Sequence, residues 1–537
     1  MTQLRSISHN LHGNLFGGIT AAIVALPLAL AFGISSGAGP VAGLYGAIIV
    51  GFFAAIFGGT PTQISGPTGP MTVVMTATIA SFIAENPDNG LALAFTTVFL
   101  GGCIQILFGF LRIGKYIIMV PYPVISGFMT GIGVIIILLE LGPLLGFPAE
   151  GSIVQAVAAL PAQFYQFDIS ALSVGLLTLA IIYLWRGKAS RIIPGPLLAL
   201  ILGTLALGLF FPDSRIERIG EIPSAFPKLQ MPVFEWSLVA EMLVKALMLA
   251  VLGSIDSLLT SLVADNVTGT QHNSDKELIG QGIGNAVAGL FGGLPGAGAT
   301  MRTLVNIRAG GTGPVSGATH ALILLAIVTG LGFLFGSIPL AVLAGILIKV
   351  GIDIIDWPFV KRIHRLPRFP AALMLLVFFI TVFVDLITAV FVGVFIKNLV
   401  TINKLSQLEL GNVIFSNGTE NNEQLTDSER KLLEQHGGEA VLLRITGPLS
   451  YAVARGLTGT LKQFQQQKLL IVDMTRSSII GISTAMVLEE LINRALEQGS
   501  EVKLIDGNTS SHGELQQLGL IERVGKENCL SSINQLI

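Results

Sequence analysis

Apolar segments long enough to cross a lipid bilayer recur along most of this 537-residue chain, from residue 14 to about residue 405. A spanning helix needs about 20 consecutive, mainly apolar residues, and stretches such as "LFGGITAAIVALPLALAFGI" meet that length. Only 12% of the residues are charged, whereas soluble domains carry about 25%. Because lipid leaves every backbone polar group to be satisfied within the protein, the pattern predicts an α-helical polytopic membrane protein.

Two of the apolar segments are short and interrupted by glycine and proline. They are "SGPTGPMTVV" at 65–74 and "GAGATMRT" at 296–303. With interrupted segments counted as half-helices, the chain has about 14 helices. A broken helix inside a membrane must be buried in protein or line a cavity. A pair of them in corresponding places of two halves predicts the binding site of a transporter.

The start of each broken helix offers backbone amides to a negative ligand. The first helical N–H groups have no partner within their own helix and carry partial positive charge. Two such ends that converge would form an anion site built from backbone, with hydroxyl groups as further donors. We therefore predict that an anion binds at Thr68, Gly69, Gly298, Ala299 and Thr300.

Charged side chains inside the apolar segments are costly in lipid and usually functional. They are Asp256, Arg302 and Asp385. Thr260 follows Asp256 by four residues, so both lie on one face of a helix. This carboxylate and hydroxyl can hold a small hard cation such as sodium. Asp256 can equally carry a proton or pair with Arg302, and the sequence leaves these alternatives open.

The charges of the loops indicate orientation. Basic loops at 112–115, 186–191 and 361–368 alternate with loops that lack lysine and arginine, such as 84–90. By the positive-inside rule, both termini are expected in the cytoplasm, with the chain in the inner or plasma membrane.

The composition changes near residue 405. We predict a cytoplasmic segment at 1–13, a transport domain at 14–405, a polar linker at 406–436 and a small cytoplasmic α/β domain at 437–537. In the last region "EAVLLRITG", "KLLIVDMT" and "EVKLIDG" are typical of strands. "STAMVLEELINRALEQGS" is typical of an amphipathic helix that ends at a glycine.

Several long motifs resemble the SulP family of inorganic anion transporters. They are "GPVAGLYGAIIVGFFAAIFGGTPTQISGPTGPMTVV", "SIDSLLTSLVAD", "HNSDKELIGQGIGN" and "GGLPGAGATMRTLVNIRAGG". "LLIVDMTRSSIIGISTAMVLEELI" resembles the STAS domain that these proteins carry at the C-terminus. Residues 14–145 and 253–300 are most similar to the family's sodium-dependent bicarbonate transporters of cyanobacteria.

The resemblance implies two inverted seven-helix repeats with the UraA-type fold, in which a core bundle moves against a gate bundle like an elevator. It also implies homodimers. It places sodium at Asp256, Thr260 and the backbone near Gly298 and Thr300, and bicarbonate against Thr68, Ala299 and Thr300.

Two residues depart from the family patterns. Arg302 accompanies Asp256, whereas in the sodium-dependent bicarbonate transporters a small residue is expected in its place. The arginine either neutralises Asp256 and weakens a sodium site or faces the anion. In the STAS domain Ile482 precedes Ser483, where an acidic residue is expected. Ser483 is therefore only a candidate regulatory phosphorylation site.

The sequence patterns and the family resemblance together predict a secondary transporter that imports bicarbonate with sodium and needs no cofactor. The alternatives are a proton-coupled carrier of sulfate or a dicarboxylate, and a channel-like or STAS-based sensory protein. No nucleophile–base pair, metal cluster or phosphate loop suggests an enzyme. The net charge of −2 does not suggest nucleic acid as a partner.

Overall fold

The computed structural model consists of two compact units, Met1–Val394 and Phe395–Ile537. The structure describes residues 10–117, 120–150, 152–185, 187, 193–214, 216–220, 226–384, 386–410, 413–417, 425–449, 467–480, 482–505, 516 and 519–536. Each unit is described separately below.

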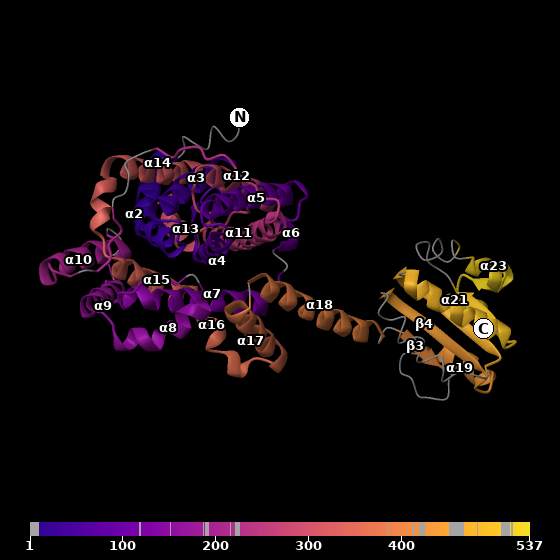
Figure 1. Ribbon diagram of the computed structural model, residues 1–537. Coiled ribbons are helices and arrows are strands. Elements are labelled where there is room, and N and C mark those ends of the chain that lie inside the picture. The colour runs from indigo at the N-terminus through magenta and orange to yellow at the C-terminus, as the bar shows by residue number, and fades with distance from the viewer. Residues whose placement is uncertain are drawn as a thin grey trace. The chain divides into compact units, whose positions relative to one another are not determined.

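One helical bundle of the first unit is built from two stretches of the chain. Its elements pack chiefly α12 against α3 and α5, α14 against α2 and α3, and α11 against α5. Figure 1 shows them together in the upper part of the first unit. We call this the core bundle. Its helices are α2 (Leu11–Ser35), α3 (Pro40–Phe57), α4 (Gly69–Glu85), α5 (Gly90–Phe110), α11 (Val239–Thr268), α12 (Ser274–Leu290), α13 (Thr300–Arg308) and α14 (Pro314–Leu331).

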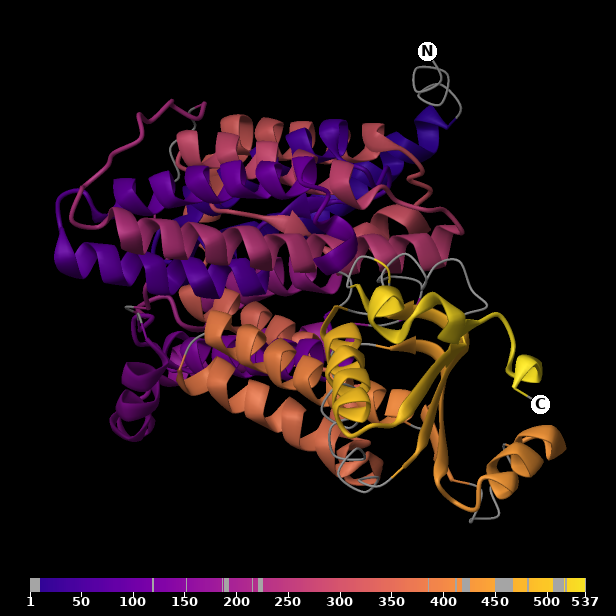
Figure 2. The same ribbon diagram turned by 90° about the vertical axis from the view of Figure 1, so that its right-hand side faces the viewer.

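The remaining long helices of the first unit form a second bundle, which we call the gate bundle. Here α15 packs against α7 and α9, α17 against α7, and α10 against α9. Figure 2 shows core and gate as two layers. The helices of the gate bundle are α7 (Tyr122–Leu144), α8 (Ile153–Tyr165), α9 (Ile169–Leu184), α10 (Gly195–Phe210), α15 (Leu340–Ile354), α17 (Arg368–Phe383) and the start of α18 (Leu386–Leu410).

Short helices connect the longer ones. They are α6 (Gly114–Ile117), α16 (Trp357–Val360) and the 3₁₀ turns η2 (Gly332–Ser337) and η3 (Ile363–Arg365). In the described part of the chain, seven helices are long and apolar enough to span a membrane, and α4, α10 and α17 are shorter apolar helices. Directly before α9 the chain forms α8, which is bent by 113° from α9.

The order of elements repeats along the first unit. In each half two long helices precede a two-residue strand, and a helix begins just after it. The strands β1 (Ser65–Gly66) and β2 (Ala297–Gly298) pair antiparallel, with Ser65 opposite Gly298. The two half-helices α4 and α13 therefore start side by side inside the core bundle, as the glycine and proline pattern predicted.

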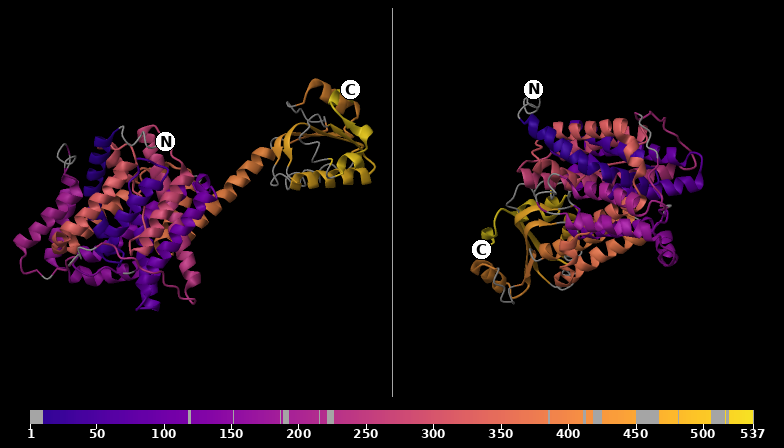
Figure 3. Two further views of the ribbon diagram at one scale, coloured as in Figure 1. Left: turned by 90° about the horizontal axis from the view of Figure 1, so that it is seen from above. Right: turned by 90° about the vertical axis from the view of Figure 1, so that its left-hand side faces the viewer.

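The second unit contains a five-stranded sheet in the order β3-β4-β5-β6-β7. The pair β3–β4 is antiparallel and the other pairs are parallel. Figure 3 draws this unit in orange to yellow. Its elements are β3 (Val413–Ser416), α19 (Asp427–Gln435), β4 (Ala440–Leu449), β5 (Leu469–Ile480), α21 (Ile482–Glu497), β6 (Glu501–Ile505), α23 (Leu520–Val524), η4 (Lys526–Asn528), β7 (Cys529–Leu530) and η5 (Ile533–Gln535).

Alternating strand residues bury both faces of this sheet. Val441, Leu443 and Val472 pack with α21 and α23 on one face. Leu442 and Ile471 pack with α19 on the other. The range predicted as a linker, 406–436, contains the end of α18, β3 and α19.

Candidate functional site

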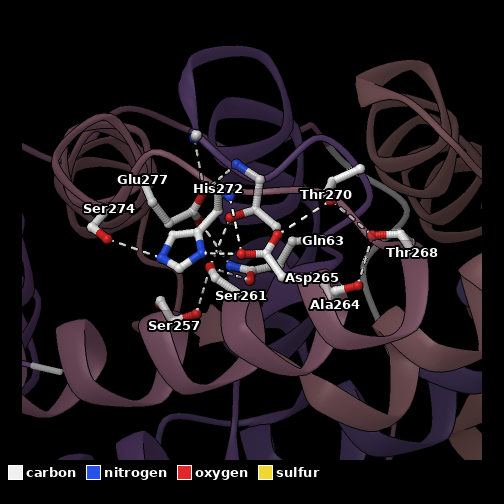
Figure 4. A network of polar contacts seen from close by, with 12 residues as sticks. Gln63, Ser257, Ser261, Ala264, Asp265, Thr268, Thr270, His272, Ser274 and Glu277 are labelled. Atoms are coloured by element: carbon white, nitrogen blue, oxygen red, sulfur yellow. Dashed lines mark hydrogen bonds and ion pairs between the residues drawn. The ribbon is translucent and has the colours of Figure 1, made fainter.

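Polar residues four apart on α12 hold the loop that leads into β1. Glu277 is 1% exposed. Its Oε2 accepts hydrogen bonds from the amides of Gly59 and Thr60 at 2.8 Å. Its Oε1 accepts from Nε2 of Gln63 at 2.7 Å and of Gln281 at 2.8 Å. Four donors surround one buried carboxylate, so residues 59–63 are fixed to α12 (Figure 4).

The same helix face fixes the second broken segment. Asn285, two turns beyond Glu277, donates to the carbonyl of Gly296 at 2.9 Å and accepts from its amide at 2.7 Å. Gln281 donates to Oγ of Ser65 at 2.6 Å. One polar stripe on α12 therefore sets the position of both β1 and β2, and through them the starts of α4 and α13.

Hydroxyl groups of α11 also form hydrogen bonds with the backbone of β2. Ser257 accepts from the amide of Gly298 at 3.0 Å, and Thr260 donates to its carbonyl at 2.9 Å. Thr260 also shares a hydrogen bond of 2.8 Å with Oγ1 of Thr300. Thr260 and Thr300, predicted on separate grounds, are direct neighbours.

Both half-helices begin at one cavity of about 330 Å³. Thr68, the residue before α4, uses no side-chain oxygen to cap the helix, and Ala299 occupies the same position before α13. The cavity lies between the bundles, because Met129 of α7 and Val350 of α15 close its gate side. Of the residues predicted as ligands, it is lined by Thr68, Gly69, Asp256, Gly298, Ala299, Thr300 and Arg302.

Two oxygen atoms at this cavity are buried without a hydrogen-bond partner in the described part of the chain. They are Oγ1 of Thr68 and Oδ2 of Asp256. Their side chains lie close to one another. A buried carboxylate oxygen without a donor is unfavourable unless a ligand satisfies it. Asp256 therefore offers an acceptor oxygen to a cation or a proton.

Arg302 is 2% exposed and points back toward the loop before α4. Its Nη2 donates to the carbonyl of Pro67, and its charge acts on Asp256 through space. Gly66 makes room for it: the φ of Gly66 is +152°, and a Cβ there would lie 2.8 Å from Nη1 of Arg302. Arg302 thus lines the cavity, with Pro67 as its hydrogen-bond partner.

Several residues of the site were not predicted from the sequence. Glu277, Gln281 and Asn285 recur every four residues, and the other residues of α12 after Glu277 are glycine or apolar. That spacing could have identified them. Asp353 lines the cavity from the gate bundle and pairs with Lys349 at 2.5 Å. Nothing in its local sequence points to the site, because only packing of α15 against the core brings it there.

Two residues that the sequence singles out are not fully described by the structure. Asp385 lies outside the described residues. Ser483 lies in the first turn of α21, and its side chain is not among those described. The range of the sequence resembling a STAS domain does form the strand and helix pattern expected of it.

Both units of the chain match models of known protein families. Residues 11–377 match the family model "Sulfate permease family", and residues 431–534 match "STAS domain". The chain is 47% identical over 493 residues to the bicarbonate transporter BicA of Synechocystis sp., covering 92% of this chain and 87% of that one.

Solved structures agree with this assignment. The transmembrane domain of a cyanobacterium bicarbonate transporter BicA matches with a TM-score of 0.67 and 54% identity, over 71% of this chain and 98% of that one. Murine Solute Carrier 26 family member A9 matches with a TM-score of 0.82 and 19% identity, over 99% of this chain and 91% of that one, which shows a shared fold. The relatives are transporters rather than enzymes. This chain is a multi-pass membrane protein that belongs to the sulfate permease (SulP) family of anion transporters and carries a C-terminal STAS domain.

Proposed function

We propose that this protein imports bicarbonate together with sodium. The observation that carries the proposal is the cavity where two helix N-termini meet beside Asp256 and Thr68. Helix N-termini favour an anion, and the buried carboxylate of Asp256, whose Oδ2 has no hydrogen-bond partner among the described residues, favours a cation. The similarity to BicA supports bicarbonate as the anion.

Each ligand has its own set of atoms in this proposal. The anion lies against the amides of Gly69 and Thr300 and the hydroxyl of Thr68. Ala299 forms part of the wall, and its own amide donates to the carbonyl of Ile64 at 2.9 Å. Sodium lies at Asp256 and Thr260, near the backbone of Gly298. Arg302 adds positive potential from the wall of the cavity. A bound cation next to Asp256 removes the negative charge that would otherwise repel the anion.

Movement of the core bundle against the gate bundle would carry the site across the membrane. The cavity supports this elevator-like step, since core elements supply most of its polar groups, while the gate helices supply Met129, Val350 and Ile354 and the carboxylate of Asp353. We further propose that the chain forms a homodimer and that both termini lie in the cytoplasm, as the loop charges indicate.

A second candidate function is proton-coupled transport of sulfate or a dicarboxylate. The observation that favours it is Arg302, a fixed positive charge at the cavity. With that charge present, an anion needs less help from sodium, and Asp256 could carry a proton instead.

The test is uptake of radiolabelled bicarbonate and of sulfate into proteoliposomes, each with and without an inward sodium gradient. The proposal predicts sodium-stimulated bicarbonate uptake that saturates and accumulates against the gradient of the anion. Sodium-independent sulfate uptake would support the second function instead. Uptake that never exceeds equilibrium would point to a channel.

A further inference from the structure

A second polar cavity lies next to the proposed transport site. It has a volume of about 360 Å³. Like the transport site, it is lined by α2, α4, α7 and α15. Phe32 of α2 lines the transport site and Ser35 lines this cavity, and three residues correspond to about 4.5 Å along a helix. The two cavities therefore follow one another along the boundary between core and gate.

The walls of this cavity are acidic. Glu140, Glu150 and Glu217 line it, and of the described residues around it none is basic. The C-terminal end of α2, at Ser35, also faces it. A helix C-terminus carries partial negative charge and favours a cation.

Glu140 is the one carboxylate of the three that is buried, at 4% exposure. Its Oε1 has no hydrogen-bond partner in the described part of the chain. The hydroxyl of Ser35 lies against the same carboxyl group. Thr76 of α4 lines the cavity and donates to the carbonyl of Ser35 at 3.1 Å. Carboxylate and hydroxyl oxygens thus converge on a space large enough for a partly hydrated ion.

We propose that Glu140, with Ser35 and Thr76, forms a second binding site for a monovalent cation, on the route between the transport site and one membrane surface. The inference deepens the proposed sodium-coupled function and rests on it for the identity of the ion as sodium. A cation here offsets the charge of a buried carboxylate whose Oε1 has no hydrogen-bond partner among the described residues. It also reduces the repulsion that an entering anion meets, so the cation should bind before the anion.

The test counts bound ²²Na⁺ per chain on the purified full-length protein at equilibrium, without transport. Wild type is expected to bind two ions, Glu140→Gln one, Asp256→Asn one and the double variant none. Glu85→Gln, an exposed carboxylate at the end of α4, is the matched control and should retain both ions. Ser35→Ala keeps the carboxylate and should weaken one of the two sites several-fold.

Sodium binding by Glu140→Gln that matches wild type in number and affinity would overturn the inference. If Glu140→Gln loses an ion while Asp256→Asn loses none, the second site stands and the proposed role of Asp256 fails. If only Asp256→Asn loses an ion, the proposed function stands and the second site does not. A melting temperature measured for each variant separates loss of the site from loss of the fold.

Discussion

At the scale of single residues, the proposed site depends on where a few charges sit relative to two helix ends. Asp256 supplies a carboxylate oxygen that has no hydrogen-bond partner among the described residues, and Arg302 supplies positive charge held by the carbonyl of Pro67. Opposite charges at one cavity can serve an anion and a cation at the same time. Substitutions at these two residues should therefore affect different ligands.

Replacing Arg302 with alanine should raise the KM for bicarbonate, because it removes positive charge beside the anion. The maximal rate at saturating anion should fall less than the affinity. Initial uptake rates over a range of bicarbonate concentrations measure both. Arg308→Ala, at the far end of the same helix, is the control. An unchanged KM in Arg302→Ala would contradict this role for the arginine.

Replacing Gly66 with alanine should destabilise the protein and abolish uptake. The φ of Gly66, +152°, is rarely adopted by other residues. A Cβ would also lie 2.8 Å from Nη1 of Arg302. Thermal unfolding of the purified variant measures the effect. Gly208→Ala in α10, where a Cβ meets nothing within 4 Å, should be neutral or slightly stabilising. Equal unfolding midpoints for the two variants would refute the argument.

At the scale of elements, the polar stripe of α12 positions the two half-helices. Glu277, Gln281 and Asn285 touch no cavity atom, and they act through the loops that they bind. One face of α12 holds β1 and β2 together. Weakening these hydrogen bonds should therefore lower the affinity for both ligands of the site.

Replacing Glu277 with glutamine should lower the unfolding midpoint and weaken both bicarbonate and sodium affinity. The amide group of glutamine would face donors that now bind a carboxylate, and hydrogen bonds to a charged group contribute about 1.5–3 kcal/mol. Uptake kinetics and thermal unfolding measure the two effects. Glu85→Gln, which is exposed, is the control. Loss of affinity for one ligand alone would argue against a positioning role.

The sequence predicts those parts of the fold and of the site that depend on residues close together in the chain. Glycine and proline spacing within ten residues located the starts of α4 and α13, since breaks in a helix are local features. The contact between Glu277 and Gln63 joins residues 214 apart, and no local pattern reveals it. Gate residues such as Met129 and Asp353 line the cavity only because the bundles pack. The strand β3 escaped notice because a short apolar run lies within polar sequence.

At the scale of the whole molecule, the second unit has a core of its own, with a buried ion cluster. Arg444 on β4 binds Asp473 on β5 at 2.8 Å and also Glu429 on α19. Burial lowers the pKa of Arg444, but hydrogen bonds and charge from the two carboxylates outweigh it and raise the pKa above its usual value. The guanidinium therefore stays charged and ties α19 to the sheet.

Replacing Arg444 with alanine should destabilise the STAS domain by about 3–5 kcal/mol, because two buried carboxylates lose their partner. Thermal or denaturant unfolding of the full chain, followed by a probe in the second unit, measures the change. Arg494→Ala breaks an exposed pair with Glu490 and should cost less than about 1 kcal/mol. Similar losses for both variants would show that burial does not set the strength of the cluster.

The central claim is that sodium at Asp256 and bicarbonate at the two helix ends stabilise one another. Two ligands that favour each other do so reciprocally. The most direct measurement is the affinity for bicarbonate at low and high sodium, in wild type and in Asp256→Asn. We predict that sodium raises the bicarbonate affinity of wild type and leaves that of the variant unchanged. Equal sodium dependence in both proteins would contradict the assignment of the cation to Asp256.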